Sequence, residues 1–173
     1  MVINEAELRN LVKRIMELTL ELAGSNEKDI LLVLPGDDVD SLRSLLASFK
    51  CKNCNLTIVA SEKQMSDVQL GKLICSKANK VVSPEAVLRD ALDFDKVIYL
   101  KMPRDILAKC ALCVPDVPEV KLFDKALREG VCVSLAKKAI DPFTDCEPEG
   151  YRQKILGYVR NLLEYGIEIE LDA

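Results

Sequence analysis

Short apolar runs alternate with segments of helical periodicity along most of the chain. The clearest run, 30–34, is continuously apolar, has the length of a strand and ends at Pro35-Gly36. A run of this kind is typical of a central parallel strand that is buried on both faces. Further strands are predicted at 56–60, 80–82, 97–100 and 131–135, and a half-exposed edge strand at 167–171.

Helices are predicted between these strands. Their apolar residues recur at helical spacing over 38–50, 84–92, 103–113, 118–129 and 149–165, whereas 62–76 fits both a helix and a short strand. Strands that alternate with helices predict an α/β domain with a mostly parallel sheet and helices on both faces. Because ligands bind such sheets at the carboxyl ends of the strands, we expect them at the segments after Leu34, Ala60, Leu100 and Leu135.

Residues 4–23 form a separate amphipathic pattern. Asn4 can cap a helix whose apolar residues are spaced three and four apart, and Gly24 can end it. This helix either packs on its own domain or serves as a docking or oligomerising segment before a polar hinge at 24–28. It is similar to the encapsulation helices on enzymes of bacterial microcompartments. We therefore divide the chain into an amphipathic helix, 1–24, and a single α/β domain, 25–173.

Composition narrows the function classes. The 173 residues are 49% hydrophobic and 30% charged, which is ordinary for a globular protein. The net charge of −4 gives no reason to expect nucleic-acid binding, and no apolar run reaches the ~18 residues of a membrane helix. The N-terminus lacks the pattern of a signal peptide, so we expect a cytoplasmic protein with mostly free thiols.

The chain has seven cysteines and no histidine. The missing histidine removes the commonest general base and the commonest zinc ligand. The pairs Cys51-x-x-Cys54 and Cys110-x-x-Cys113 fit a metal or thiol redox protein, and Lys50 and Lys52 would lower a thiol pKa at the first pair. The second pair lies in a helix-forming stretch, so we expect Cys110, Cys113 and Cys132 to be core residues and predict no metal site.

Two loops at predicted strand ends are candidate sites. The first loop contains Asp37, Asp38 and Asp40 before a helix, which is the position of a phosphate loop. Because the acids would repel a phosphate, the same residues also fit a helix cap. In the second, Lys101 and Arg104 precede a helix, where an anion would bind, although an ordinary turn with solvated charges has the same pattern. We expect the second loop to contact a ligand.

Residues 96–135 resemble a known family. The order is a strand Val97-Ile98-Tyr99-Leu100, a turn with proline, the helix sequence Leu-Ala-Lys-Cys-Ala-Leu, a second helix ending at Gly130 and the strand Val131-Cys132-Val133. It resembles the flavoprotein superfamily of phosphopantothenoylcysteine decarboxylases, lantibiotic cysteine decarboxylases and flavin prenyltransferases. The resemblance implies a three-layer, flavodoxin-like (Rossmann-like) α/β fold and a homo-oligomer. It also implies FMN at a subunit interface, with its phosphate near the first loop.

The sequence departs from this family at several positions. Pro103 and Asp105 stand where the family has serine and asparagine, and no histidine can fill the catalytic position of the cysteine decarboxylases. Cysteine decarboxylation is therefore not expected, and enzymatic activity stays open. The residues in loops that could reach FMN are Gly36, Ser41, Ser61, Met102, Pro103 and Arg104.

Three functional hypotheses follow. The first is a flavoprotein-like domain that binds FMN or a related nucleotide. The second is a non-catalytic interaction or assembly subunit, associated with a microcompartment or another partner through residues 4–23, that has lost flavin binding. The third is a thiol redox or metal protein built on the CxxC pairs.

Overall fold

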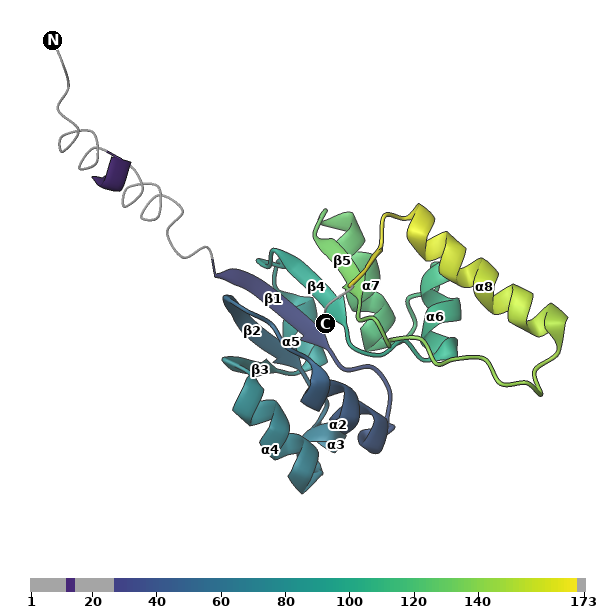
Figure 1. Cartoon of the computed structure of the whole chain (residues 1–173), viewed down its shortest axis with the longest axis horizontal. Coiled ribbons are helices and arrows are strands. Elements are labelled where there is room, and N and C mark those ends of the chain that lie inside the picture. Colours follow the sequence, from purple (N-terminus) through teal and green to yellow (C-terminus); the bar gives the residue numbers. More distant parts are fainter. Residues whose placement is uncertain (1–11, 15–26, 171–173) are drawn as a thin grey trace, which may run out of the picture.

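The structure is a computed structural model, and it describes residues 12–14 and 27–170 (Figure 1). The predicted N-terminal helix at 4–23 lies outside the described residues except for 12–14, which are helical. The division of the chain near residue 24, and the docking role of the helix, therefore stay predictions.

One six-stranded, all-parallel sheet organises the described domain (Figure 1). Its strand order is β3-β2-β1-β4-β5-β6. The strands are β1 (Lys28–Val33), β2 (Cys54–Val59), β3 (Lys80–Val82), β4 (Lys96–Tyr99), β5 (Cys132–Leu135) and β6 (Glu168–Ile169). The predicted edge strand is thus confirmed, and it pairs parallel to β5 through Ser134 and Leu135.

Helices form the outer layers. They are α2 (Val39–Ser48), α3 (Glu62–Ser66), α4 (Val68–Lys77), α5 (Pro84–Arg89), α6 (Arg104–Ala111), α7 (Pro118–Arg128) and α8 (Glu149–Glu164). α2 and α3 pack against α4 and form one group of helices. α5 and α6 pack against α7, and α6 also packs against α8, which makes a second group; Figure 1 shows the two groups apart from each other. The predicted three-layer, flavodoxin-like α/β fold is confirmed. Within the described residues, no helix is both long enough and apolar enough to cross a bilayer.

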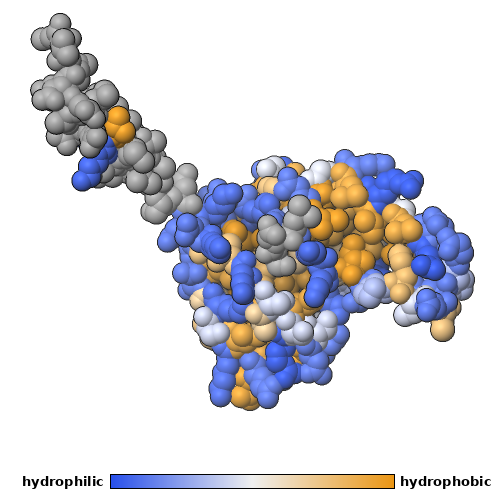
Figure 2. Space-filling model, viewed as in Figure 1, coloured by the Kyte–Doolittle hydropathy of each residue, from blue (hydrophilic) through white to orange (hydrophobic). Residues whose placement is uncertain are grey.

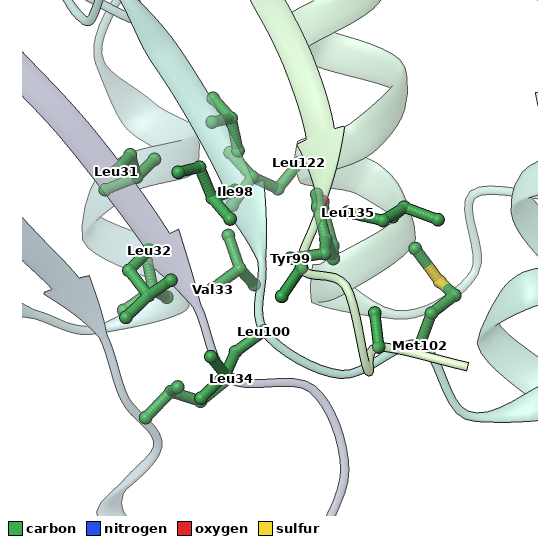
Figure 3. Packing of buried hydrophobic residues seen from close by; sticks show 14 of the residues in the cluster. Leu31, Leu32, Val33, Leu34, Ile98, Tyr99, Leu100, Met102, Leu122 and Leu135 are labelled. Atoms are coloured by element: carbon green, nitrogen blue, oxygen red, sulfur yellow. The ribbon is translucent and has the colours of Figure 1, made fainter. Parts of the chain in front are cut away.

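The core lies on the two central strands (Figure 3). Leu31, Leu32 and Val33 of β1 are all buried, so side chains from both faces of the strand are covered. Tyr99 of β4 is also fully buried, and its hydroxyl donates a hydrogen bond to the Glu119 carbonyl oxygen at 2.7 Å. The prediction of a central strand from the continuous apolar run 30–34 is therefore confirmed. On the neighbouring strand β4, the one buried hydroxyl, that of Tyr99, is hydrogen-bonded.

The ambiguous segment 62–76 forms two helices. Ser61 caps α3 in a capping box with Gln64, and Asp67 then caps α4 by accepting a hydrogen bond from the Leu70 N–H at 2.7 Å. The aspartate ends the first helix because its backbone is extended, and its carboxylate starts the second. The short-strand alternative for this segment is thereby excluded.

The helix predicted at 103–113 ends at Ala111, two residues early. Cys113 lies in the turn beyond it with φ +56° and is exposed, so the prediction of Cys113 as a core residue was wrong. A left-handed backbone cannot continue a helix, and the turn directs the side chain outward. Cys110 is buried as predicted, and Cys132 is half-buried.

Candidate functional site

The strand order creates a switch point between β1 and β4. From β1 the chain proceeds outward to β2 and β3, and then returns to β4 on the other side and proceeds to β5 and β6. The connections after β1 and β4 therefore leave toward opposite faces and meet at the carboxyl edge, the place where the ligand crevice of such sheets lies. This is where the two candidate loops meet.

The loop after β1 approaches the loop after β4 closely. Gly36 has φ +87°, and a Cβ atom added there would lie 3.3 Å from Cγ of Pro103. Glycine is needed at this position because the left-handed backbone disfavours a side chain and the proline limits the room for one. Gly36 and Pro103, two of the predicted site residues, therefore lie in close contact where the two loops meet.

Gln64 holds the loop after β1 in place through side-chain hydrogen bonds. Its side chain is only 3% exposed, and its Nε2 donates to the carbonyl oxygens of Leu34 at 2.7 Å and Gly36 at 2.9 Å. Its Oε1 accepts from the Ser61 N–H at 2.9 Å. One amide side chain thus joins the end of β1 to the end of β2 and fixes the geometry of the crevice.

Lys101 supplies the central charge of the crevice. Its side chain is 8% exposed, and its Nζ donates to Ser41 Oγ at 2.7 Å and Asp38 Oδ2 at 3.2 Å. Asp141, in the segment after β5, lies 3.7 Å from the same ammonium. One cation therefore connects the first turn of α2 with the segments after β4 and β5.

The acidic residues of the first loop have structural partners. Asp38 is the N-cap of α2 and accepts a hydrogen bond from the Ser41 N–H at 3.2 Å. This backbone hydrogen bond, with the one from Lys101, lowers the pKa of Asp38 below its ordinary value. Asp37 pairs with Lys63, and Asp40 with Arg43 on the same helix. The interpretation of this loop as a helix cap is confirmed.

Arg104 lies at the start of α6 and has an internal partner. Its Nη2 donates to Glu147 Oε1 at 2.9 Å, and its guanidinium stacks over the rings of Phe143 and Tyr151, at 5.3 and 5.5 Å from their centroids. These contacts attach the start of α6 to the segment before α8 and to the first turn of α8. In this arrangement the guanidinium positive charge is directed toward Glu147.

The Arg104–Glu147 pair predicts a pH dependence of stability. The hydrogen bond from Arg104 is the main cause that lowers the pKa of Glu147 below its ordinary value. A carboxyl whose pKa is lower in the folded state stabilises the fold above its unfolded pKa, and this stabilisation is lost as the pH falls through the folded pKa. Glu147→Gln is therefore expected to have a lower urea midpoint than the wild type at pH 7. The difference between the two midpoints should become smaller as the pH is lowered to 3. Equal differences at both pH values would contradict this assignment.

The remaining predicted residues occupy different positions. Ser41 contributes its hydroxyl beside Lys101, whereas Ser61 caps α3, and its Oγ accepts a hydrogen bond from the Gln64 N–H at 3.3 Å. The Met102 side chain is buried in the core, and its N–H donates to the Ala139 carbonyl oxygen at 2.7 Å, so neither is turned toward a ligand. A cavity beside Leu34, Ser61 and Gln64 measures about 10 Å³, which is about the space one water molecule needs.

Sequence reasoning missed the roles of Gln64 and Asp141. The Ser-x-x-Gln spacing at 61–64 signals a capping box, but no local pattern shows that the same amide reaches Leu34 and Gly36. Asp141 follows a segment without periodicity, and its approach to Lys101 depends on the neighbouring positions of β4 and β5. Both roles become visible only with the sheet order.

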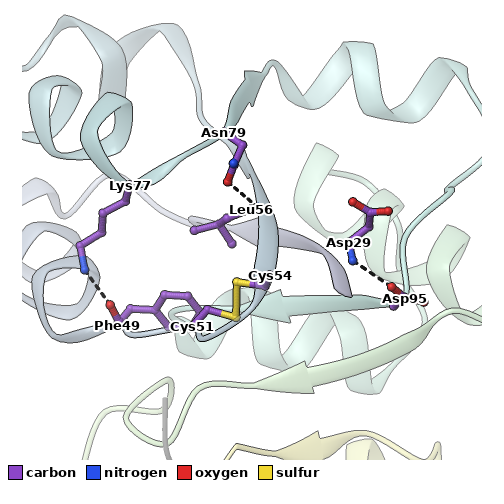
Figure 4. Close-up of a disulfide and its surroundings, with 8 residues drawn as sticks. All are labelled: Asp29, Phe49, Cys51, Cys54, Leu56, Lys77, Asn79 and Asp95. Atoms are coloured by element: carbon purple, nitrogen blue, oxygen red, sulfur yellow. Dashed lines mark hydrogen bonds between the residues drawn. A yellow bond between two sulfur atoms is a disulfide. The ribbon is translucent and has the colours of Figure 1, made fainter. Parts of the chain in front are cut away.

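The cysteines do not join this site. Cys51 and Cys54 form a disulfide at the amino end of β2, the opposite edge of the sheet (Figure 4). The other five cysteines are free. Within 12–14 and 27–170, no group of three or more His, Cys, Asp or Glu residues is placed to hold a metal ion.

Comparison with solved structures identifies the fold. A dodecameric FMN-dependent UbiX-like decarboxylase from Escherichia coli O157:H7 matches with a TM-score of 0.57 and 15% identity, over 82% of this chain and 78% of its own. The FMN-dependent cysteine decarboxylase TvaF of thioviridamide biosynthesis matches with a TM-score of 0.55 and 16% identity, over 84% and 91%.

DmrB from Burkholderia xenovorans, described as a cubic protein cage for redox transfer, matches with a TM-score of 0.54 and 13% identity, over 85% and 90%. No protein-family model matches the chain, and no curated protein matches its sequence. The fold that the resemblance implies is thus confirmed, at low sequence identity.

Proposed function

We propose that this domain binds FMN or a related nucleotide at the crevice between β1 and β4, with the phosphate at Lys101 and Ser41. The observation that carries the proposal is the Lys101 ammonium, held 2.7 Å from Ser41 Oγ beside the first turn of α2. A cation, a hydroxyl and a helix N-terminus are the groups that bind phosphate in proteins. Neighbours with this fold include DmrB in complex with FMN.

The phosphate would replace the acids that now neutralise Lys101. The side chain of Asp141 is 55% exposed and can turn into solvent with little loss of packing, whereas Asp38, 61% exposed, would have to keep its N-cap hydrogen bond from the Ser41 N–H or lose the cap. Lys101 is the buried partner of the three and keeps its position. A phosphate dianion would then accept from the Lys101 ammonium in place of the carboxylates, and in addition from the Ser41 hydroxyl, which in this structure accepts from Lys101.

The flavin ring requires space outside the chain's interior. The cavity beside Leu34 and Ser61 holds about one water, so the ring would lie along the loops after β1 and β4 or between subunits. Several large apolar side chains on α8, on β6 and in the segment after α6 are exposed, and Figure 2 shows apolar residues at the surface of the domain. Exposed apolar side chains of this kind fit a subunit contact. The exposed residues are Leu112, Val114, Tyr151, Leu156, Leu163, Tyr165 and Ile169. We therefore propose a homo-oligomer, as in the dodecameric neighbour.

Cysteine decarboxylation is not part of the proposal. The chain has no histidine, so the imidazole that the resemblance places at the catalytic position of the cysteine decarboxylases is missing. The residues at the crevice bind and orient a ligand through Lys101 and Ser41, and they do not suggest a general base for a substrate.

Titration with FMN and riboflavin tests the proposal. Flavin fluorescence should be quenched on addition of the protein, and FMN should bind at least ~10-fold more tightly than riboflavin, because charge-assisted hydrogen bonds to the phosphate contribute about 1.5–3 kcal/mol. Equal affinity for both ligands would contradict a phosphate site at Lys101. No quenching with either ligand would reject flavin binding.

A second candidate function is supported by the internal ion pairs. Both cations of the predicted ligand loop, Lys101 and Arg104, already have carboxylate partners. A site that neutralises its own charges fits a non-catalytic interaction or assembly subunit that has lost flavin binding. Such a protein would show an oligomer or a partner complex and no change in FMN fluorescence.

A further inference from the structure

The Cys51–Cys54 loop lies at the amino edge of the sheet, away from the crevice (Figure 4). Asn53 has φ +53°, which turns the chain between the two cysteines. The Asn53 carbonyl oxygen accepts a hydrogen bond from the Lys28 N–H at 3.2 Å, and Cys54 is the first residue of β2. The sheet therefore fixes Cys54, whereas Cys51 belongs to the loop.

A groove of about 360 Å³ opens beside this disulfide. We call it the disulfide groove, and its lining residues are Phe49, Lys50, Cys51, Lys52, Cys54, Leu56, Lys77 and Asn79. Among the described residues that line the disulfide groove, three are lysines and none carries a carboxylate. Lys50, Cys51 and Lys52 also line a second groove, whose lining includes the carboxylates Asp95 and Glu170, so Cys51 borders two grooves.

The lysines give the groove a positive potential. Lys50 and Lys52 are exposed on either side of Cys51. Lys77 donates to the Phe49 carbonyl oxygen at 2.6 Å and to that of Ala47 at 3.2 Å, which holds its ammonium at the end of α2. Burial, and next the charge of Lys50, lower the pKa of Lys77, so the lysines act on one another. Positive charge of this kind stabilises a thiolate and attracts anions.

We propose that Cys51 and Cys54 form a thiol–disulfide exchange pair for a small thiol that carries carboxylates. This function goes beyond flavin binding and uses the opposite edge of the sheet. Three observations support it together: the bonded cysteine pair, the lysines beside it and the open groove. The carboxylates of the small thiol would lie against Lys50, Lys52 and Lys77 while its sulfur reaches Cys51.

The exchange balances in both directions. In oxidation, the Cys51 thiolate attacks one sulfur of the small disulfide, which releases one small thiolate and leaves a mixed disulfide on Cys51. The Cys54 thiolate then attacks the Cys51 sulfur, forms the Cys51–Cys54 bond and releases the second small thiolate. Two electrons pass from the protein to the small disulfide, and the two released thiolates take up the two protons of the cysteines.

The test uses the reduced full-length chain and two small disulfides as probes. The probes are glutathione disulfide, which is anionic, and hydroxyethyl disulfide, which is neutral. Formation of the Cys51–Cys54 bond is followed by alkylation of the remaining thiols and mass spectrometry of the peptides. At low salt, we expect Lys50→Gln/Lys52→Gln to slow oxidation by glutathione disulfide ~10-fold. The loss of rate with hydroxyethyl disulfide should be several-fold smaller than this. The double variant Lys121→Gln/Lys72→Gln, with exposed lysines outside the groove, controls for net charge.

Three results would overturn the proposal. The first is an equal loss of rate with both probes, because the groove would then not select an anionic thiol. The second is loss of the circular dichroism spectrum on reduction, since an exchange pair must fold in both states. The third is faster reaction of glutathione disulfide at Cys146, a free exposed thiol between Asp145 and Glu147, than at Cys51. None of these readouts depends on flavin, so failure here is distinct from failure of FMN binding.

Discussion

Gln64→Leu is expected to destabilise the domain by about 3 kcal/mol or more. The substitution removes three hydrogen bonds at once and leaves the carbonyl oxygens of Leu34 and Gly36 and the N–H of Ser61 without their partner. Each buried group without a partner costs about 1–3 kcal/mol, whereas a leucine of similar size restores only part of this through apolar contact. The free energy of unfolding, measured in urea by circular dichroism, checks the prediction.

Two variants control for this result. Gln64→Glu keeps the shape of the side chain but replaces the donor to Leu34 and Gly36 with an acceptor, so it should destabilise at least as much at pH 7. Ser61→Ala removes the N-cap hydroxyl of the same capping box and should cost only about 1 kcal/mol. If Gln64→Leu cost no more than Ser61→Ala, the amide would act only as a helix cap and would not brace the crevice.

The fold was predictable from local patterns. The run 30–34 is apolar at every position, and only a strand covered on both faces makes use of such a run. Pro84 and Ser83 likewise marked the start of α5 correctly, because capping depends on neighbouring residues. The positions of the candidate loops followed from the strand ends alone, since all strands of a parallel sheet end at one edge.

The partners inside the crevice were not predictable. Lys101 contacts Ser41 across 60 residues of sequence, and Arg104 contacts Glu147 across 43. Such pairs depend on which strands are neighbours, and the order β1-β4 places the loops side by side only at the switch point. The sequence therefore indicated that Lys101 and Arg104 were charges at a helix start, but not that carboxylates already neutralise them.

This neutralisation bears on how tightly a ligand can bind. An anion that enters the crevice must displace Asp38 and Asp141 from Lys101, so part of its interaction replaces an existing one. The exposed Asp141 carboxylate regains water when it is displaced, which keeps its cost small. Displacing Asp38 completely would also remove the N-cap of α2, which costs about 0.5–2 kcal/mol. Arg104 is different, because Glu147 and the ring of Phe143 cover its guanidinium, and its charge is less available to a ligand.

Lys101→Met is expected to weaken FMN binding by about 10- to 100-fold and to leave riboflavin binding nearly unchanged. Methionine keeps the length of the apolar stem but removes the ammonium, and a charge-assisted hydrogen bond to phosphate contributes about 1.5–3 kcal/mol. Without the cation, Asp38 would also repel the phosphate. Fluorescence titration with both flavins measures the effect, and urea unfolding checks that the variant folds.

Asp141→Asn and Lys72→Met complete this experiment. Asp141→Asn removes a competing carboxylate 3.7 Å from Lys101 and should tighten FMN binding a few-fold, whereas Lys72→Met removes an exposed lysine of α4 and should change nothing. Opposite effects of Lys101→Met and Asp141→Asn on one ligand would require that the phosphate and the carboxylate compete for the same ammonium. If Lys101→Met weakened FMN and riboflavin equally, the lysine would support the loops rather than contact the phosphate.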